Sequence, residues 1–146
     1  MQDLQDTERS ACDLSPELTR PFRALRLWLP LKVHGTAAFA AALEEKLLLA
    51  AYFYDQVKQL PNVEVGTPPD LSIVAFRFTP PEVDADQFNE ALVDAIARDG
   101  RVFLTSTQLN GHYVIRMAIL NYMSHKAEVD LVLEVLATLL PQVKLK

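Results

Sequence analysis

The stretch that decides the fold is residues 100–119, GRVFLTSTQLNGHYVIRMAI. The Asn-Gly pair at 110–111, between two segments rich in strand-forming side chains, is a strong signal for a two-residue type I′ hairpin turn. Counting outward from such a turn places Thr105 directly opposite Arg116 on the returning strand. The sequence therefore predicts an antiparallel hairpin in which one arginine stands among apolar neighbours.

A long helix precedes the hairpin in the sequence. Residues 36–60 carry apolar side chains at spacings of three and four, which is typical of an amphipathic helix. We expect its buried stripe to contain Phe39, Leu43, Leu47, Ala50, Tyr54 and Val57. We expect its solvated face to contain Glu44, Glu45, Lys46, Asp55 and Lys58.

Two strands and two more helices complete the predicted pattern. Residues 62–65 and 71–79 have strand composition, and the second strand ends at a Pro-Pro pair. Asp84 has the position of an N-cap in a capping box, and Gly100 has that of a helix C-cap. Ser124 is the predicted cap of the last helix. The order helix, strand, strand, helix, strand, strand, helix implies an α+β fold, with a small, mostly antiparallel sheet and helices packed on one face.

The region before residue 36 is expected to be irregular. Ser15 and Pro16 have the character of a helix start, whereas Pro21 and Pro30 interrupt any long helix. The predicted divisions are a flexible N-terminal segment at 1–14, a broken helical connector at 15–35 that ends in a bend or a helix cap at Gly35, and a domain at 36–146.

Composition narrows the class of protein. The chain has 146 residues, a net charge of −5 and one cysteine, Cys12. A single cysteine excludes an intrachain disulfide and agrees with a cytoplasmic protein. The acidic balance argues against nucleic acid as a partner. No stretch approaches the roughly 20 apolar residues of a membrane span, and the polar, acidic start is unlike a secretory signal.

Arg116 is the first candidate for a functional residue. A guanidinium in an apolar strand must be paired, because burying a lone charge is costly. A fork that grips a carboxylate in bidentate fashion is one interpretation. A salt bridge to an internal acid, or a strand end that reaches solvent, are the alternatives. Thr105 and Thr107 offer hydroxyls on the neighbouring strand, although threonine is also an ordinary strand residue.

Other candidate sites have weaker support. Arg20, Arg23 and Arg26 share one helical face, which suits an anion, a partner domain or plain solvation. The three histidines lack metal-ligand spacing, and the four glycines form no phosphate loop. We therefore predict no metal site, and no nucleophile motif supports acyl transfer.

Three stretches together resemble one enzyme family. Residues 20–28, RPFRALRLW, resemble the "RRFRALKLW" signature of the group II pyridoxal-phosphate-dependent amino-acid decarboxylases, which include aromatic-amino-acid, histidine and glutamate decarboxylases. Residues 71–77, LSIVAFR, look like the family strand "LGLVCFR". Residues 100–119 are similar to "GRxFLTxTxLxGxxxLRxAI". Pro21 in place of an arginine and Arg26 in place of a lysine depart from the first signature.

The resemblance implies a position at the carboxyl end of a longer enzyme of the aspartate-aminotransferase-like fold. Arg116, Thr105 and Thr107 would lie on the substrate-carboxylate side of its active site. The cofactor pyridoxal 5'-phosphate would be held elsewhere, because its lysine and aspartate have no counterpart in this chain. The dipeptide at 125–126, His-Lys, is interpreted as a coincidence.

The resemblance also sets the expected partners. They are the large cofactor-binding domain of the same enzyme and a second copy of the chain. By itself the chain is expected to be inert and to bind no cofactor. The partner's absence would leave Leu25, Leu27, Trp28, Leu29 and Leu31 partly exposed. Two other hypotheses remain open, a free-standing α+β interaction or regulatory module and the small domain of a different transaminase-like enzyme.

Overall fold

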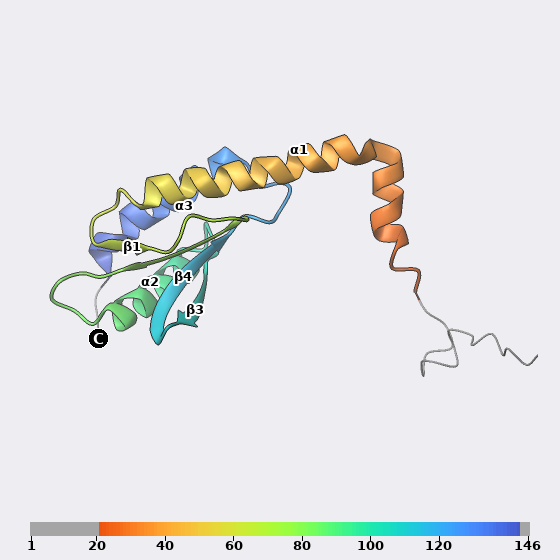
Figure 1. Cartoon of the computed structure of the whole chain (residues 1–146). Coiled ribbons are helices and arrows are strands. Elements are labelled where there is room, and N and C mark those ends of the chain that lie inside the picture. Colours follow the sequence, from red (N-terminus) through yellow and green to blue (C-terminus); the bar gives the residue numbers. More distant parts are fainter. Residues whose placement is uncertain (1–20, 144–146) are drawn as a thin grey trace, which may run out of the picture. The chain divides into compact units, whose positions relative to one another are not determined.

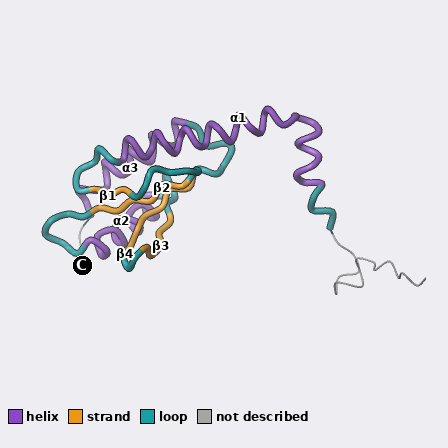
Figure 2. Tube along the Cα trace, in the orientation of Figure 1, coloured by secondary structure: helices purple, strands orange, loops and turns teal. Residues whose placement is uncertain are grey.

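The structure is a computed structural model that describes residues 21–143. The predicted features at Ser15, Arg20 and Cys12 lie outside the described residues. The chain divides into two compact units, Met1–Phe39 and Ala40–Lys146, and each is considered by itself. Figure 1 shows the order of elements, and Figure 2 shows the same trace by secondary structure.

Helix α1 (Leu25–Val57) begins in the first unit. Pro30 lies inside it, so the helix continues through a proline that was expected to interrupt it. A proline removes one N–H donor, and the helix continues on both sides of that missing bond. Gly35 does leave helical geometry, with φ 74° and ψ 166°. In this unit Leu27 and Trp28 are more than half exposed, as predicted.

The second unit contains a four-stranded sheet with the order β1-β2-β4-β3. Its strands are β1 (Val63–Val65), β2 (Ile73–Phe78), β3 (Thr105–Leu109) and β4 (His112–Ala118). All three pairings are antiparallel. This arrangement confirms the predicted α+β fold.

The hairpin β3–β4 has the predicted turn and register. Asn110 and Gly111 both have positive φ, 52° and 81°, as a type I′ turn requires. Thr105 pairs with Arg116. The dipeptide at the turn thus determines which side chains of the two strands are neighbours.

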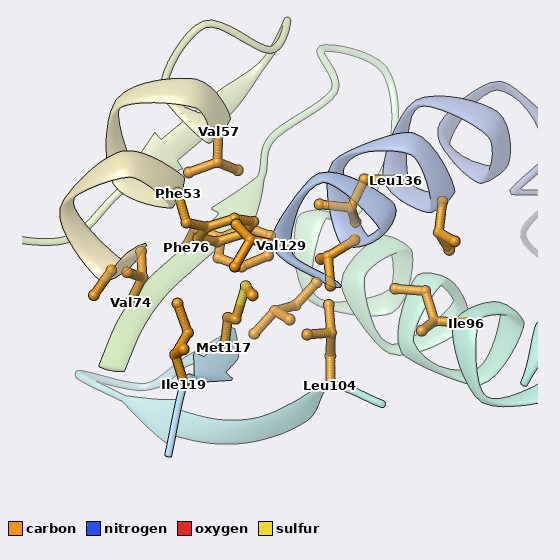
Figure 3. Packing of buried hydrophobic residues seen from close by; sticks show 14 of the residues in the cluster. Phe53, Val57, Val74, Phe76, Ile96, Leu104, Met117, Ile119, Val129 and Leu136 are labelled. Atoms are coloured by element: carbon orange, nitrogen blue, oxygen red, sulfur yellow. The ribbon is translucent and has the colours of Figure 1, made fainter. Parts of the chain in front are cut away.

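One face of the sheet packs against the helices. Alternate residues of β2, Val74, Phe76 and Phe78, are buried against residues 40–57 of α1, helix α2 (Ala85–Asp99) and helix α3 (Lys126–Leu139). Figure 3 shows this core from close by, with Phe53 of α1 and Val129 of α3 near Phe76. The rings of Phe53 and Phe76 meet edge to face, with centroids 5.6 Å apart.

The buried face of α1 differs from the predicted stripe. Lys46 and Phe53 are buried, whereas Leu43 and Leu47 are 66% and 43% exposed. Lys46 was expected on the solvated face. The reason for both errors is that α1 is apolar on several sides between Ala37 and Ala51, so spacing alone does not select the face that packs.

The helix caps follow the sequence signals closely. The Asp84 side chain accepts a hydrogen bond from Gln87 N, and Gly100 ends α2 with φ 75°. Helix α3 is capped at His125 and not at Ser124 as predicted. The carboxylate of Glu128, three residues into the helix, accepts the N–H of His125 at 2.7 Å.

Side chains of helix α2 make hydrogen bonds to the two central strands, β2 and β4, at the point where these strands separate. The ladder between β2 and β4 reaches Phe76 and Ile115, and Phe78 lies beyond it. There Asn89, which is fully buried, accepts from Phe78 N at 2.9 Å and donates to Phe78 O at 2.7 Å. The Asp86 carboxylate accepts from Tyr113 N of β4 at 2.9 Å. Two side chains of α2 thus satisfy strand groups that have lost their strand partner.

Candidate functional site

The candidate site lies on the sheet face away from the helices. Because side chains alternate along a strand, Arg116 points to the face opposite its buried neighbours Ile115 and Met117. Ala75 of β2 and Thr105 of β3 pair with Arg116 on its two sides. The three residues therefore form one row across this face of the sheet. We call the face away from the helices the open face.

Arg116 is half-buried and lacks a counter-ion in the described part of the chain. Its Nη2 donates to Thr105 Oγ1 at 3.4 Å, which is a long and weak contact. Its Nε is buried without a hydrogen-bond partner. No ion pair of residues 21–143 includes it. The internal salt bridge considered from the sequence is therefore not found among these residues.

The structure brings Thr105 to Arg116, but it places Thr107 further along β3. Thr107 pairs with Val114 and is exposed. Both threonines share the open face with Arg116, because they lie two residues apart on one strand. Of the two threonines, Thr105 carries the hydroxyl that contacts the guanidinium of Arg116.

A second arginine, which the sequence reasoning did not single out, lies on the same face. Arg77 of β2 has a side chain only 15% exposed, and its Nε donates to Glu64 Oε2 at 2.8 Å. Its Nη1 is 3.6 Å from Asp86 Oδ1. The signal was present in the alternation of β2, where Arg77 stands between two buried phenylalanines. Arg77 is paired with two acids, and in this it differs from Arg116.

Neither of two hollows in the second unit includes Arg116. A groove of about 180 Å³ on the open face is lined by Arg77, Val114 and the hairpin turn. A larger apolar pocket of about 430 Å³ lies between Pro61, Phe88 and Pro141. The hollow on the open face therefore lies beside Arg77 and the hairpin turn and not at Arg116.

The lysines of the described chain do not fit a pyridoxal-phosphate site. A lysine that attacks the cofactor aldehyde must be neutral, whereas Lys126 donates to Asp130 Oδ2 at 2.7 Å and to Tyr52 Oη at 3.1 Å. These partners, Asp130 first, raise the pKa of Lys126 and stabilise its charge. Lys46 is buried but donates to two backbone carbonyls and to Glu45.

The two remaining lysines of the described chain, Lys32 and Lys58, and one histidine, His125, have neighbours within the chain. Lys32 and Lys58 lie near the rings of Trp28 and Tyr54. His125 Nδ1 is 2.7 Å from Glu45 Oε1. Among residues 21–143 no group of three His, Cys, Asp or Glu side chains is placed to hold a metal ion. Within the same residues, no helix has both the length and the apolar character that a membrane crossing requires.

Comparison with known proteins identifies the family. The chain is 36% identical over 118 residues to tyrosine decarboxylase 2 of Arabidopsis thaliana, covering 79% of this chain and 22% of that protein. It is 38% identical over 109 residues to the aromatic-L-amino-acid decarboxylase of Bacillus atrophaeus, covering 72% and 23%. A phenylacetaldehyde synthase of Arabidopsis thaliana is 35% identical over 105 residues, 70% of this chain and 21% of that protein. No protein-family model matches the chain.

Solved structures give the same result for the fold. The tryptophan decarboxylase of Catharanthus roseus, solved in complex with L-tryptophan, superposes with a TM-score of 0.79 at 27% identity, over 84% of this chain and 27% of that one. The chain spans about a fifth of the length of the curated relatives that it matches. The chain therefore belongs to the family of group II pyridoxal-phosphate-dependent amino-acid decarboxylases, of which it corresponds to a domain-sized part.

Proposed function

We propose that this chain is the part of an amino-acid decarboxylase that holds the substrate carboxylate, with Arg116 as the group that binds it. The observation that carries the proposal is the state of Arg116 among residues 21–143. It is half-buried, its Nε is unpaired, and no acid neutralises it. A carboxylate that accepts hydrogen bonds from two guanidinium N–H groups would supply both the missing charge and the missing hydrogen bond.

Thr105 has a positioning role in this proposal. Its Oγ1 lies 3.4 Å from Arg116 Nη2 and 3.5 Å from the Arg116 carbonyl. In this role the hydroxyl holds the Nη2 end of the guanidinium, while Nε, which is enclosed by the protein, still lacks a partner. Thr107, two residues along the same face, would border the substrate.

The substrate class that we propose is an aromatic L-amino acid. This follows the names of the relatives, which include tyrosine, tryptophan and aromatic-L-amino-acid decarboxylases. A phenylacetaldehyde synthase matches about as well as these decarboxylases. We therefore assign to this segment the recognition of the amino acid and not the choice between amine and aldehyde as product.

Pyridoxal phosphate belongs, in this proposal, to the complete enzyme and not to this segment. When bound there, it supplies the electron sink that decarboxylation needs. The described lysines do not fit its attachment, so the 146-residue chain by itself should have no decarboxylase activity. The partners are the large cofactor-binding domain and a second copy of the enzyme, and the compartment is the cytoplasm. A regulatory module derived from this fold remains the alternative.

A chimera tests the assignment of Arg116. In the Bacillus atrophaeus decarboxylase, the segment that matches this chain is replaced by the corresponding residues of this chain. Arg116→Gln in the chimera should lower kcat/KM roughly 10- to 100-fold, mainly through KM, because a hydrogen bond to a charged group contributes about 1.5–3 kcal/mol. Arg98→Gln, on the exposed end of α2, is the matched control, and its kcat/KM should stay within about twofold of that of the parent chimera.

The aromatic amine product provides a sharper readout. It lacks the carboxylate, so Arg116→Gln should leave inhibition by the amine unchanged while weakening the binding of the amino acid. Equal kcat/KM in the parent chimera and in Arg116→Gln would refute the role of Arg116. An inactive chimera with the native sequence would favour the module.

A further inference from the structure

The turn of the hairpin β3–β4 places an asparagine side chain next to a glycine amide in an exposed position. Asn110 and Gly111 are both exposed, and both have positive φ, 52° and 81°. A Cβ added to Gly111 would meet no atom within 4 Å, so open space surrounds this residue. Among residues 21–143, the backbone hydrogen bonds of turns, loops and caps do not involve the N–H of Gly111. The nitrogen that follows the asparagine is therefore open to reaction.

An asparagine in this setting can cyclise onto the backbone. After the Gly111 amide loses its proton to water or hydroxide, its nitrogen adds to Cγ of Asn110. The bond from Cγ to the side-chain nitrogen then breaks, ammonia leaves, and a five-membered succinimide remains. Water opens this ring at Cγ to give aspartate, or at the backbone carbonyl to give isoaspartate, in which the chain runs through the former side chain. Water is the only co-reactant, and nothing is oxidised or reduced.

The residue after the asparagine decides how easily the ring closes. Glycine has no Cβ, so the Cγ of Asn110 approaches the following nitrogen without a clash, and glycine enters backbone conformations that other residues avoid. Each other asparagine of residues 21–143 precedes a larger residue. Asn62 is the closest comparison, because it is also exposed and has φ 55°, but the β-branched Val63 follows it. The two sites thus differ mainly in the residue that supplies the nitrogen.

The tip of the hairpin is the part of the sheet that can move to allow ring closure. Within the described chain, β3 lies at the edge of the sheet and pairs with β4 alone. The start of β3 follows the buried Leu104, whereas Gln108 and Leu109 next to the turn are exposed. Segments with few buried contacts open locally at a small cost in free energy. The reactive pair therefore lies where the backbone is least restrained by packing.

We infer that Asn110 is a site of spontaneous deamidation and that the isoaspartate formed there opens the tip of the hairpin. Isoaspartate adds one atom to the backbone, whereas a two-residue turn fixes the pairing of its strands through its length and its two positive φ angles. The pairs next to the turn, Leu109 with His112 and Thr107 with Val114, should therefore separate. The groove on the open face changes shape with them, because the turn lines it.

The first test follows the modification in the 146-residue chain, aged in warm, mildly alkaline buffer. Trypsin releases residues 59–77 and 102–116, which contain one asparagine each, so mass spectrometry follows Asn62 and Asn110 separately. Asn110 should gain the mass of the acid at least roughly tenfold faster than Asn62, because Val63 shields its own nitrogen. An isoaspartate-specific carboxyl methyltransferase should label the 102–116 peptide. Asn110→Gly keeps a residue suited to the turn and should prevent both changes.

The second test measures the opening of the tip by hydrogen exchange. The residues that flank a two-residue turn form a hydrogen-bonded pair, so the Leu109 and His112 amides report on it directly. In the isoaspartate form these amides should exchange at least roughly tenfold faster, while the amide of Phe76 on the central strand β2 stays within about twofold. Freshly prepared Asn110→Asp is the matched control. It carries the same new charge without the extra backbone atom, and Asp-Gly suits the same turn, so it should exchange like the parent.

Three results would overturn the inference. The first is conversion of Asn110 at a rate no higher than that of Asn62. The second is an isoaspartate form whose tip amides exchange as slowly as those of the parent, because the turn would then accommodate the extra atom. The third is an equal loss of protection in Asn110→Asp, which would assign the effect to charge. None of these measurements depends on the role of Arg116, so the proposed function can fail while this inference stands, and the reverse also holds.

Discussion

Asn89→Ala should strongly destabilise the domain through the loss of hydrogen bonds between helix α2 and the sheet. Asn89 is fully buried and makes hydrogen bonds to Phe78 N, Phe78 O and Ala85 O, at 2.9, 2.7 and 2.6 Å. Alanine would leave the N–H and the carbonyl of Phe78 unpaired at the point where β2 separates from β4. The ladder to β4 ends at Phe76, and β1 pairs with Phe78.

The magnitude follows from those two groups. Each buried polar group left unsatisfied costs about 1–3 kcal/mol, and alanine returns roughly 0.5 kcal/mol through its better helix propensity. We therefore expect Asn89→Ala to lower the free energy of unfolding by about 2–5 kcal/mol, a large share of the roughly 5–15 kcal/mol typical of a domain. Asn89→Asp should not rescue it, because a carboxylate cannot donate to Phe78 O.

Urea unfolding of the 146-residue chain, followed by circular dichroism, measures the effect. Glu90→Ala, at the exposed neighbouring position, is the control and should change stability by less than about 0.5 kcal/mol. A loss below about 1 kcal/mol for Asn89→Ala, with an unchanged slope against urea, would refute the assignment of Asn89 as the bridge between α2 and the sheet.

Three further predictions concern pH, the hairpin and the cofactor. The hydrogen bond from His125, and then that from Lys46, lower the pKa of Glu45 in the folded chain. The contribution of Glu45 to stability should be complete above about pH 4.5 and should be lost as the pH falls through the lower pKa of the folded state. Glu45→Gln should therefore make the free energy of unfolding less dependent on pH between about pH 6 and 3. Gly111→Ala should cost about 1–2 kcal/mol in urea unfolding, because φ is 81° while a Cβ would meet no atom within 4 Å; a neutral result would contradict the left-handed turn. Borohydride treatment of the chain with pyridoxal phosphate should trap no stoichiometric adduct at Lys126, and mass spectrometry that finds one would show that this lysine holds the cofactor after all.

The hairpin shows how far local sequence signals reach. Asn110 and Gly111 prescribe the turn, and the turn prescribes that Arg116 stands beside Thr105, so the central pair of the candidate site was predictable by counting. The caps at Asp84 and Gly100 were predictable for the same reason, since all their partners lie within a few residues.

Features that depend on distant partners were not predictable in this way. Lys46 can be buried because the carbonyls of Tyr122 and Ser124, 76 and 78 residues away, accept hydrogen bonds from its ammonium group. The pairing of Arg77 with Asp86 requires knowing where α2 crosses the sheet. That no acid of residues 21–143 pairs with Arg116 also depends on the folding of distant segments, because several acids lie close enough in sequence to have been candidates.

The contacts between α1 and α3 have a consequence for synthesis on the ribosome. Lys46 binds the loop that leads into α3, and Tyr52 donates to Asp130 at 2.7 Å, so the first and last helices of the second unit depend on each other. About 80 residues of chain separate these partners. Until α3 emerges, β2 can cover part of the buried face of α1 but the part that faces α3 stays open, and contacts that close such long loops form slowly. A growing polypeptide would therefore carry this half-covered helix for most of the domain's translation, which makes it a natural binding site for a chaperone during that interval.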